Sequence, residues 1–351
     1  MISFYPGPSR VEDCIPEYVS DAFNRGILSI NHRSDEFMAL TKATIEILKD
    51  RLNIPENFSV FFTSSATECW EIIAQSLIKK ESFHIYNGAF GQKWFQHTQR
   101  ITSTAQACTF DVNAGLEAPS IDIPSYADTL CITQNETSNG TQVSNARLAA
   151  IQKQYPETLI AIDATSSMAG IQLYFQNADV WYASVQKCFG LPAGLAVMIC
   201  SPRAVNRAKE LNDQSRYNSL LSIINMIEKH QTTHTPNVMG IYLLNRVMES
   251  RKPIHTIEEQ TKNRYGVILS CLKNSGLKHL VDNTDVRSLT VIPVQGGESF
   301  ISQIKKKARE QGIVLGNGYG SLNANTFRIA NFPAIKDAEI DTLTSFLKNY
   351  T

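Results

Sequence analysis

The chain has 351 residues, 43% of them hydrophobic and 19% charged, which is enough to fill the core of one large domain and a smaller one. Thirty-three basic residues balance 33 acidic ones, which excludes the broad positive field that attracts nucleic acid or an anionic membrane surface. Seven scattered cysteines without a Cys-x-x-Cys pair argue against a disulfide framework and a metal site. Because there is neither a leader-like start nor a membrane-length apolar run, we expect a cytoplasmic protein.

The predicted elements alternate between helices and short strands. The stretch 35–54 places apolar side chains at helical spacing and stops before Pro55. Several of the β-rich runs that follow are apolar nearly throughout, as in strands buried on both faces of a mostly parallel sheet. An α/β architecture is therefore predicted. The strands are expected at 58–63, 82–87, 129–134, 159–164, 180–186 and 194–201, and the helices between them at 67–78, 91–101 and 145–155.

From about residue 241 the pattern changes. Long helical stretches at 238–251 and 256–275 precede strands at 287–294 and 326–331 and a final helix at 337–350. We therefore predict a large domain of residues 14–240 and a smaller α+β domain made of residues 1–13 and 241–351. No linker or internal repeat marks the boundary between them.

One lysine stands where chemistry is expected. In SVQKCFGLPAG (184–194), Lys187 lies between an apolar strand and a Gly-Leu-Pro-Ala-Gly turn. Apolar walls destabilise an ammonium ion, so the amine becomes available for attack on an aldehyde. A lysine that binds pyridoxal phosphate in this way also needs a carboxylate for the ring nitrogen and a cradle for the phosphate. Taken singly, Lys187 would be interpreted as a surface lysine at the end of a strand.

Candidates for both companions are present. Asp163 ends an apolar strand, at the edge where α/β sheets place their ligands, although an aspartate there also suits a helix cap. In FFTSSATECWEII (61–73) a strand runs into a helix, so Ser65, Ala66 and Thr67 would offer free amides and a hydroxyl to a phosphate at the helix's positive end. A plain N-cap is the alternative interpretation of that segment.

Six segments, in order, resemble the class V group of fold type I aminotransferases and, within that group, most resemble phosphoserine aminotransferases. They are YPGPS (5–9), NHRSDEF (31–37), NGAFGQKW (87–94), QNETSNG (134–140), AIDATSS (161–167) and SVQKCFGLPAG (184–194). The resemblance implies a homodimer that uses pyridoxal 5'-phosphate to exchange an amino group between an amino acid and a 2-oxo acid. For the phosphoserine enzymes that exchange is between phosphoserine and 2-oxoglutarate, in serine biosynthesis.

The resemblance also implies cofactor contacts. Lys187 would condense with the cofactor's aldehyde, Asp163 would pair with the ring nitrogen, and Phe90 would stack on the ring where these enzymes usually have tryptophan. Thr137 would hydrogen-bond near the phenolic oxygen. The phosphate would be held by Ala66, Thr67 and Gln186, and by Thr235 of the partner subunit, which here follows His234 in place of the usual asparagine.

For the substrate, the resemblance implies that Arg328 binds the α-carboxylate, a task suited to a bidentate guanidinium. His32 and Arg33 match a pair that approaches the substrate phosphate from the other subunit. The histidine that usually precedes the carboxylate-binding arginine is absent from NGYGSLNANTFR (317–328). No metal is implied.

Other functions remain as alternatives. A class V aminotransferase that uses alanine or serine with glyoxylate is favoured by Phe90 and by the segment 320–331. A cysteine desulfurase is disfavoured, because that family has histidines where this chain has Gln186 and Phe90. GNGYG (316–320) is a weak dinucleotide fingerprint, since it opens no βαβ unit. A catalytically silent scaffold of the same fold is the last alternative, and the presence of Lys187 with Asp163 argues against it.

Overall fold

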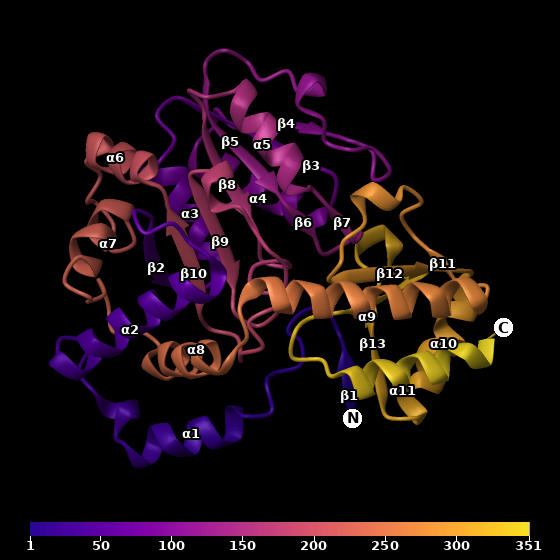
Figure 1. The fold of residues 1–351 in the computed structure, drawn as a ribbon. Coiled ribbons are helices and arrows are strands. Elements are labelled where there is room, and N and C mark those ends of the chain that lie inside the picture. Colours follow the sequence, from indigo (N-terminus) through magenta and orange to yellow (C-terminus); the bar gives the residue numbers. More distant parts are fainter. Residues whose placement is uncertain (351) are drawn as a thin grey trace.

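The computed structural model describes residues 1–350. A seven-stranded sheet forms the centre of its larger part (Figure 1). One strand, at 196–200, runs antiparallel to both of its neighbours, and the remaining neighbouring pairs are parallel. In spatial order the strands are β2 (Ser59–Thr63), β10 (Ala196–Cys200), β9 (Val180–Ser184), β8 (Leu159–Asp163), β5 (Ala127–Thr133), β3 (Glu81–Tyr86) and β4 (Gln106–Thr109).

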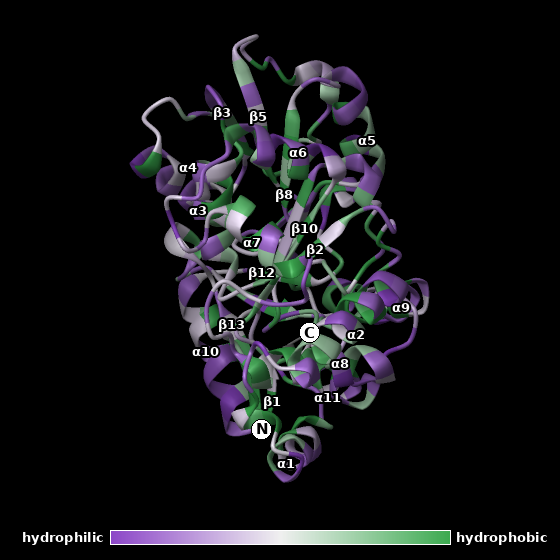
Figure 2. Ribbon diagram, turned by 90° about the vertical axis from the view of Figure 1, so that its left-hand side faces the viewer, coloured by the Kyte–Doolittle hydropathy of each residue, from purple (hydrophilic) through white to green (hydrophobic). Residues whose placement is uncertain are grey.

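Helices cover both faces of this sheet, which explains why its strands read as apolar throughout. Along β10, Met198 and Cys200 belong to the core cluster on one face, whereas Val197 and Ile199 belong to the cluster on the other. In Figure 2 hydrophobic residues gather on the strands and hydrophilic ones on the outer helices. The first face packs against α3 (Ala66–Ser76), α4 (Ala89–Ile101), α6 (Pro202–Leu211) and α7 (Leu220–Ile227), and the second cluster includes α2 (Asp35–Leu52), α5 (Asn145–Gln154) and α8 (Val238–Ser250).

A second, five-stranded sheet joins the two ends of the chain. The N-terminal strand pairs in parallel with a strand near the C-terminus, and the other pairs are antiparallel. Its order is β1 (Ile2–Phe4), β13 (Ile313–Asn317), β14 (Thr326–Ala330), β12 (Val291–Gln295) and β11 (Lys278–His279). The helices of this part are α9 (Ile254–Asn274), α10 (Glu298–Glu310) and α11 (Asp337–Leu347).

The remaining elements are α1 (Ile15–Asn24) and the short hairpin β6 (Asn135–Glu136) and β7 (Thr141–Gln142). Helix α8 packs against α1 and α2, so the helices form a continuous layer across residue 240 (Figure 1). The domain division near that residue stays a prediction.

The α/β architecture predicted from the pattern is confirmed, and each predicted strand and helix has a counterpart. The strand predicted at 287–294 begins only at Val291, because Ser288 and Thr290 hydrogen-bond each other through their side chains. The elements that were not predicted are helices α1, α6, α7 and α10 and strands β1, β4, β6, β7, β11 and β13. Strand β4 lies at the sheet edge and is mostly exposed, so it lacks the apolar signal of its neighbours.

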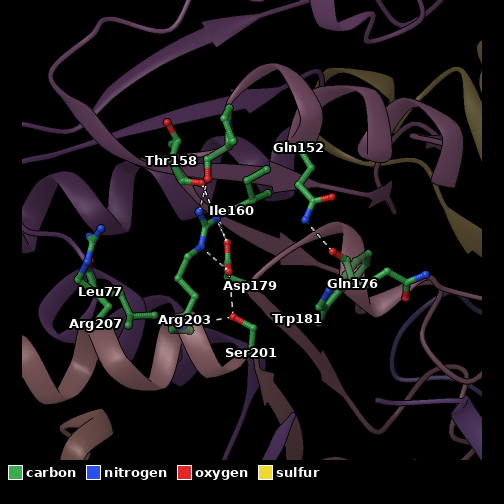
Figure 3. Close-up of polar contacts among 12 residues, drawn as sticks. Leu77, Gln152, Thr158, Ile160, Gln176, Asp179, Trp181, Ser201, Arg203 and Arg207 are labelled. Atoms are coloured by element: carbon green, nitrogen blue, oxygen red, sulfur yellow. Dashed lines mark hydrogen bonds and ion pairs between the residues drawn. The ribbon is translucent and has the colours of Figure 1, made fainter. Parts of the chain in front are cut away.

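An ionic cluster around the buried Asp179 fixes three strands at the edge opposite the carboxyl ends of β8 and β9 (Figure 3). Asp179, which precedes β9, accepts hydrogen bonds from the Ile160 amide at 2.9 Å and from Ser201 Oγ at 2.8 Å. Arg203 Nε donates to the same carboxylate at 2.8 Å, and its Nη2 donates to the Thr158 carbonyl. These bonds set the register of β8, β9 and β10 relative to α6. No helix within residues 1–350 has the length and apolarity needed to cross a membrane.

Candidate active site

A cavity of about 570 Å³ lies where the two sheets meet, at the carboxyl ends of β8 and β9. This is the edge at which open α/β sheets bind ligands, and the volume is typical of small-molecule sites. Its walls come from the N-terminal segment 5–8, from the large sheet and from the loop between β13 and β14. The lining includes Ala66, Thr67, Phe90, Thr137, Asp163, Gln186, Lys187, Tyr319 and Arg328.

Lys187 reaches into this cavity as a buried cation. Its side chain is 6% exposed, and Nζ donates to Thr137 Oγ1 at 2.8 Å and to Ser166 Oγ at 2.9 Å. Burial lowers the pKa of the ammonium to about 8, and the Asp163 carboxylate opposes that shift. Gly7 has φ of +149°, and a Cβ there would lie 3.0 Å from Lys187 Cε, so a larger residue would crowd the lysine stem.

Asp163 is the last residue of β8 and is also buried. Burial raises the pKa of its carboxyl, while hydrogen bonds from Thr165 and the charge of Lys187 oppose the rise. The Thr165 amide donates to Asp163 Oδ1 at 2.9 Å and so fixes the orientation of the carboxylate. The chain therefore holds a cation and an anion together in one desolvated cavity.

Phe90 is positioned by a carboxylate behind it. Its ring centroid lies 5.2 Å from Lys187 Nζ. Glu136 Oε2 accepts from the amides of Phe90 and Gly91 at 3.1 Å each, at the start of α4. Glu136 Oε1 accepts from the Ser138 amide at 2.9 Å and from its Oγ at 2.7 Å. A Cβ at Gly88 would lie 2.3 Å from Glu136 Cγ, so the close approach requires glycine there.

The start of α3 differs in one detail from the expected set of free donors. Ser65 is the N-cap and accepts from the Glu68 amide at 3.2 Å. The Ala66 amide is not free, because it donates to Ser184 Oγ at 2.9 Å. Thr67 lies in the first turn, where backbone amides lack helical partners, and lines the cavity together with Gln186.

Arg328 lies on β14 and closes the other side of the cavity. It is 4% exposed, and burial lowers the pKa of its guanidinium. Nε donates to the Asn317 carbonyl at 2.7 Å and Nη1 donates to the Thr137 carbonyl at 2.8 Å. Neither bond uses Nη2, so a donor remains for a ligand.

Three of the residues singled out from the sequence lie outside this cavity: His32, Arg33 and Thr235. Arg33 is exposed, and its Nη1 donates to Gln231 Oε1 at 2.7 Å. Burial and the charges of Arg33 and His234 lower the pKa of His32, so these side chains are neighbours. Thr235 is exposed next to His234. The three therefore share one surface region, while the other predicted site residues gather around Lys187.

Sequence reasoning missed several lining residues. Thr165 belongs to AIDATSS, which was considered only for its aspartate, and Ser184 opens the lysine segment. Ser166 of AIDATSS does not line the cavity but accepts a hydrogen bond from Lys187. Tyr319 lies in GNGYG (316–320) and in NGYGSLNANTFR (317–328), which were considered for a dinucleotide motif and for an absent histidine, and the tyrosine itself was not singled out. Its position after β13, next to the strand of Arg328, was the available signal.

The chemistry of the cavity fits pyridoxal phosphate. A desolvated amine lies near a carboxylate that can pair with a ring nitrogen, and an aromatic ring lies near both. Two side-chain oxygens in the lining, Thr133 Oγ1 and Asn135 Oδ1, are buried and have no hydrogen-bond partner within residues 1–350. Buried polar atoms without partners indicate that a ligand or water satisfies them.

Comparisons with known proteins agree with this chemistry. The profile of the family described as Aminotransferase class-V matches residues 6–330. A phosphoserine aminotransferase of Rhodococcus opacus is 27% identical over 350 residues, covering 96% of this chain and 92% of the relative. One from Corynebacterium glutamicum is 27% identical over 348 residues, covering 96% and 91%.

Solved structures give the same picture. A phosphoserine aminotransferase from Cytophaga hutchinsonii superposes with a TM-score of 0.95 at 31% identity, covering 99% of this chain and 98% of that one. An alanine–glyoxylate aminotransferase from Nostoc sp. has a TM-score of 0.84 at 17% identity, with coverage of 99% and 94%, and shares the fold.

We predict that Glu136→Gln destabilises the protein. An amide can present only one oxygen, so its NH₂ group would face backbone or hydroxyl donors in a buried position. The expected loss is about 1–3 kcal/mol in the free energy of unfolding, measured by urea denaturation. Glu117→Gln, which alters a largely exposed partner of Arg147, is the control and should cost less. Equal stability of Glu136→Gln and the unaltered protein would contradict the prediction.

Proposed function

The chain belongs to the class V aminotransferase family, and we propose that its amino donor is phosphoserine and its acceptor 2-oxoglutarate. As an aminotransferase it exchanges an amino group between an amino acid and a 2-oxo acid with pyridoxal phosphate. The observation that carries the proposal is the single cavity in which buried Lys187, Asp163 and Arg328 meet. The whole-length similarity to enzymes named for phosphoserine supports the choice of substrate.

Asp163 and Lys187 are proposed to divide the proton chemistry. Pyridoxal phosphate, when bound, supplies an aldehyde and a ring that draws electrons from the substrate's α-carbon. The Asp163 carboxylate, oriented by the Thr165 amide, would keep a proton on the ring nitrogen. Lys187 Nζ would take the proton from the α-carbon, a role that suits an amine whose pKa burial has lowered to about 8.

Five residues of this chain are proposed to hold the cofactor. Phe90 would cover one face of the ring, and Thr137 would hydrogen-bond near its phenolic oxygen. Thr67 and Gln186 would bind the phosphate at the positive end of α3. The small side chain of Ala66 would let the backbone at the start of α3 approach the phosphate closely. The Ala66 amide already donates to Ser184 Oγ.

A second copy of the chain is proposed to complete the site. Thr235 would reach the cofactor phosphate of the neighbouring copy, and His32 with Arg33 would reach its substrate phosphate. The support is that these exposed or half-exposed residues share one surface and lie outside their own chain's cavity. We therefore infer that the protein is a homodimer. From its composition and family we infer that it is cytoplasmic.

One observation favours a second candidate, an alanine or serine aminotransferase that uses glyoxylate. The loop between β13 and β14 carries Tyr319 and Gly320, and a histidine is absent from it. Such a loop offers no imidazole for a phosphate. The two candidates differ in the anionic group on the substrate's side chain.

The proposed substrate is tested by presenting amino donors to the cofactor-loaded enzyme. We expect kcat/KM for phosphoserine to exceed that for alanine and serine by at least about 100-fold, because a dianion gains charge-assisted hydrogen bonds that a methyl or hydroxyl group cannot make. The readout is the change in the cofactor's visible absorbance. Preference for alanine or serine with glyoxylate would replace phosphoserine by the second candidate.

We predict that the rate of cofactor attachment depends on pH through Lys187. Only the neutral amine attacks an aldehyde, so the rate of pyridoxal phosphate binding to cofactor-free protein should rise up to a pH of about 8 and level off above it. Asp163→Asn removes the charge that favours the ammonium and should move the midpoint to lower pH. Stopped-flow absorbance measures both proteins. A midpoint near 10, the value of an exposed lysine, would refute the prediction.

The shared site is tested by mixing two inactive variants. Lys187→Ala should be inactive by itself, and Arg33→Ala should lose phosphoserine turnover. In a hybrid dimer, one of the two sites would combine the intact Lys187 of the Arg33→Ala chain with the intact Arg33 of the Lys187→Ala chain. The other site of that dimer would lack both residues. Equal mixing with subunit exchange should therefore restore about a quarter of the native sites.

Sedimentation checks that hybrids form, and turnover of phosphoserine measures the recovery. Verified hybrid dimers without recovered activity would exclude Arg33 from the neighbouring site. A monomer with full activity would exclude the dimer itself.

A further inference from the structure

The mouth of the cavity is formed by an aromatic pair. Tyr319, in the loop between β13 and β14, lies with its ring centroid 5.1 Å from that of Phe90. The same ring lies 5.5 Å from Arg328 Cζ. Tyr319 therefore lies between the ring beside Lys187 and the arginine on β14, and it lines the cavity.

A second cation joins this pair. Lys93 follows Phe90 by three residues on α4, so the two side chains lie on one helix face. Its Nζ donates to the Tyr319 hydroxyl and lies 5.0 Å from the Tyr319 ring centroid and 5.7 Å from that of Phe90. Lys93 is exposed and forms no ion pair with a carboxylate of residues 1–350, so its ammonium has no carboxylate partner within these residues.

The carboxylates near the cavity are already engaged elsewhere. Asp163 interacts electrostatically with Lys187, and Glu136 accepts four bonds from α4 and Ser138. Arg328 donates to two carbonyls and forms no ion pair within the described residues. Two cations, Arg328 and Lys93, thus lie close to the Tyr319 ring without an ion pair to a carboxylate of the described residues, which is an arrangement that suits a ligand with two anionic groups.

The hydroxyl of Tyr319 is prepared to donate. Because Lys93 donates to the phenolic oxygen, the phenolic proton does not point at Lys93 and stays available for an acceptor. The ammonium has two further protons for the same acceptor. An anion at this point would receive charge-assisted bonds from both groups, which are about twice as strong as neutral ones.

We propose that Lys93 and Tyr319 form the subsite for the anionic group at the far end of the substrate's side chain. This subsite would take the γ-carboxylate of a dicarboxylic amino acid or 2-oxo acid, or the phosphate of a phosphorylated one, while Arg328 holds the α-carboxylate. The inference rests on the proposed function and deepens it. It assigns the same-chain part of the recognition to Lys93, which lies in NGAFGQKW (87–94), and to Tyr319, and the family resemblance gave neither residue a substrate role.

The test compares two 2-oxo acids that differ at this end. The cofactor-loaded enzyme carries no amino group to give them, so 2-oxoglutarate and pyruvate bind without reacting. Their dissociation constants are measured by calorimetry for the unaltered protein and for Lys93→Met and Tyr319→Phe. We expect 2-oxoglutarate to bind at least about 10-fold more weakly to Lys93→Met, the loss typical of a hydrogen bond to a charged group. The dissociation constant of pyruvate should change less than about twofold, because pyruvate has no group that reaches the subsite.

Matched variants separate charge from packing. Lys93→Arg keeps the cation and should retain most of the affinity for 2-oxoglutarate. Lys153→Met removes an exposed lysine on α5, away from the cavity lining, and should change neither constant. Tyr319→Phe keeps the ring next to Phe90 and removes only the hydroxyl. It should therefore lower the affinity for 2-oxoglutarate and leave the affinity for pyruvate unchanged. Unchanged thermal unfolding and an unchanged cofactor spectrum confirm that each variant folds and binds the cofactor.

The possible outcomes are distinct. Equal weakening of both acids by Lys93→Met, no weakening of either, or an unaltered enzyme that binds both equally well would overturn the proposal. The subsite proposal and the proposal that phosphoserine is the substrate can fail independently. An enzyme that rejects phosphoserine but loses 2-oxoglutarate selectively on Lys93→Met would refute the phosphoserine assignment and support the subsite.

Discussion

The removal of one ammonium ion from water is the constraint on which the rest of this site depends. Lys187 is buried among Gly7, Phe90 and the two hydroxyls of Thr137 and Ser166. An isolated buried cation is unfavourable, so its pKa falls to about 8 and a neutral amine becomes accessible near physiological pH. Asp163 limits that fall, because its carboxylate stabilises the charged form. The same carboxylate is thereby kept close to where a cationic ring nitrogen can replace the ammonium as its partner.

The sheet supplies the precision that this balance needs. Asp163 ends β8 and Lys187 follows β9, so the distance between them depends on the register of two neighbouring parallel strands. The Asp179 cluster fixes these strands at the opposite edge (Figure 3). A buried aspartate bound by an arginine, a hydroxyl and a backbone amide is costly to displace, because losing one partner leaves a desolvated charge. The Asp179 cluster at one edge of the sheet therefore helps to fix the relative positions of Asp163 and Lys187 at the other edge.

The sequence predicts the parts of this site that the regular structure determines. Apolar runs identify β8 and β9, and their carboxyl ends bring Asp163 and Lys187 to one edge without further information. Ser184, which accepts from the Ala66 amide, and Ser166, which accepts from Lys187, depend on side-chain orientation at the end of β9 and in the turn after β8, and no periodicity encodes that. Tyr319 lies 132 residues after Lys187 in a loop of another sheet, so its approach to Phe90 follows only from how the two sheets pack. The proposed dependence on a second copy is also invisible to periodicity, because an interface adds no pattern to a helix or strand.

The two ends of the proposed substrate are recognised by groups that differ in how they are held. Arg328 is fixed by two backbone carbonyls, those of Asn317 and Thr137, so its position follows from the path of the chain. Tyr319 is held through the side chains of Phe90 and Lys93. Every amino acid presents the same α-carboxylate, whereas side chains vary. In this fold the group that would bind the α-carboxylate is held by the backbone, whereas the groups that would bind the substrate's side chain are held by other side chains. Substitution at positions 93 and 319 can therefore change the substrate while Lys187, Asp163 and Arg328 stay in place.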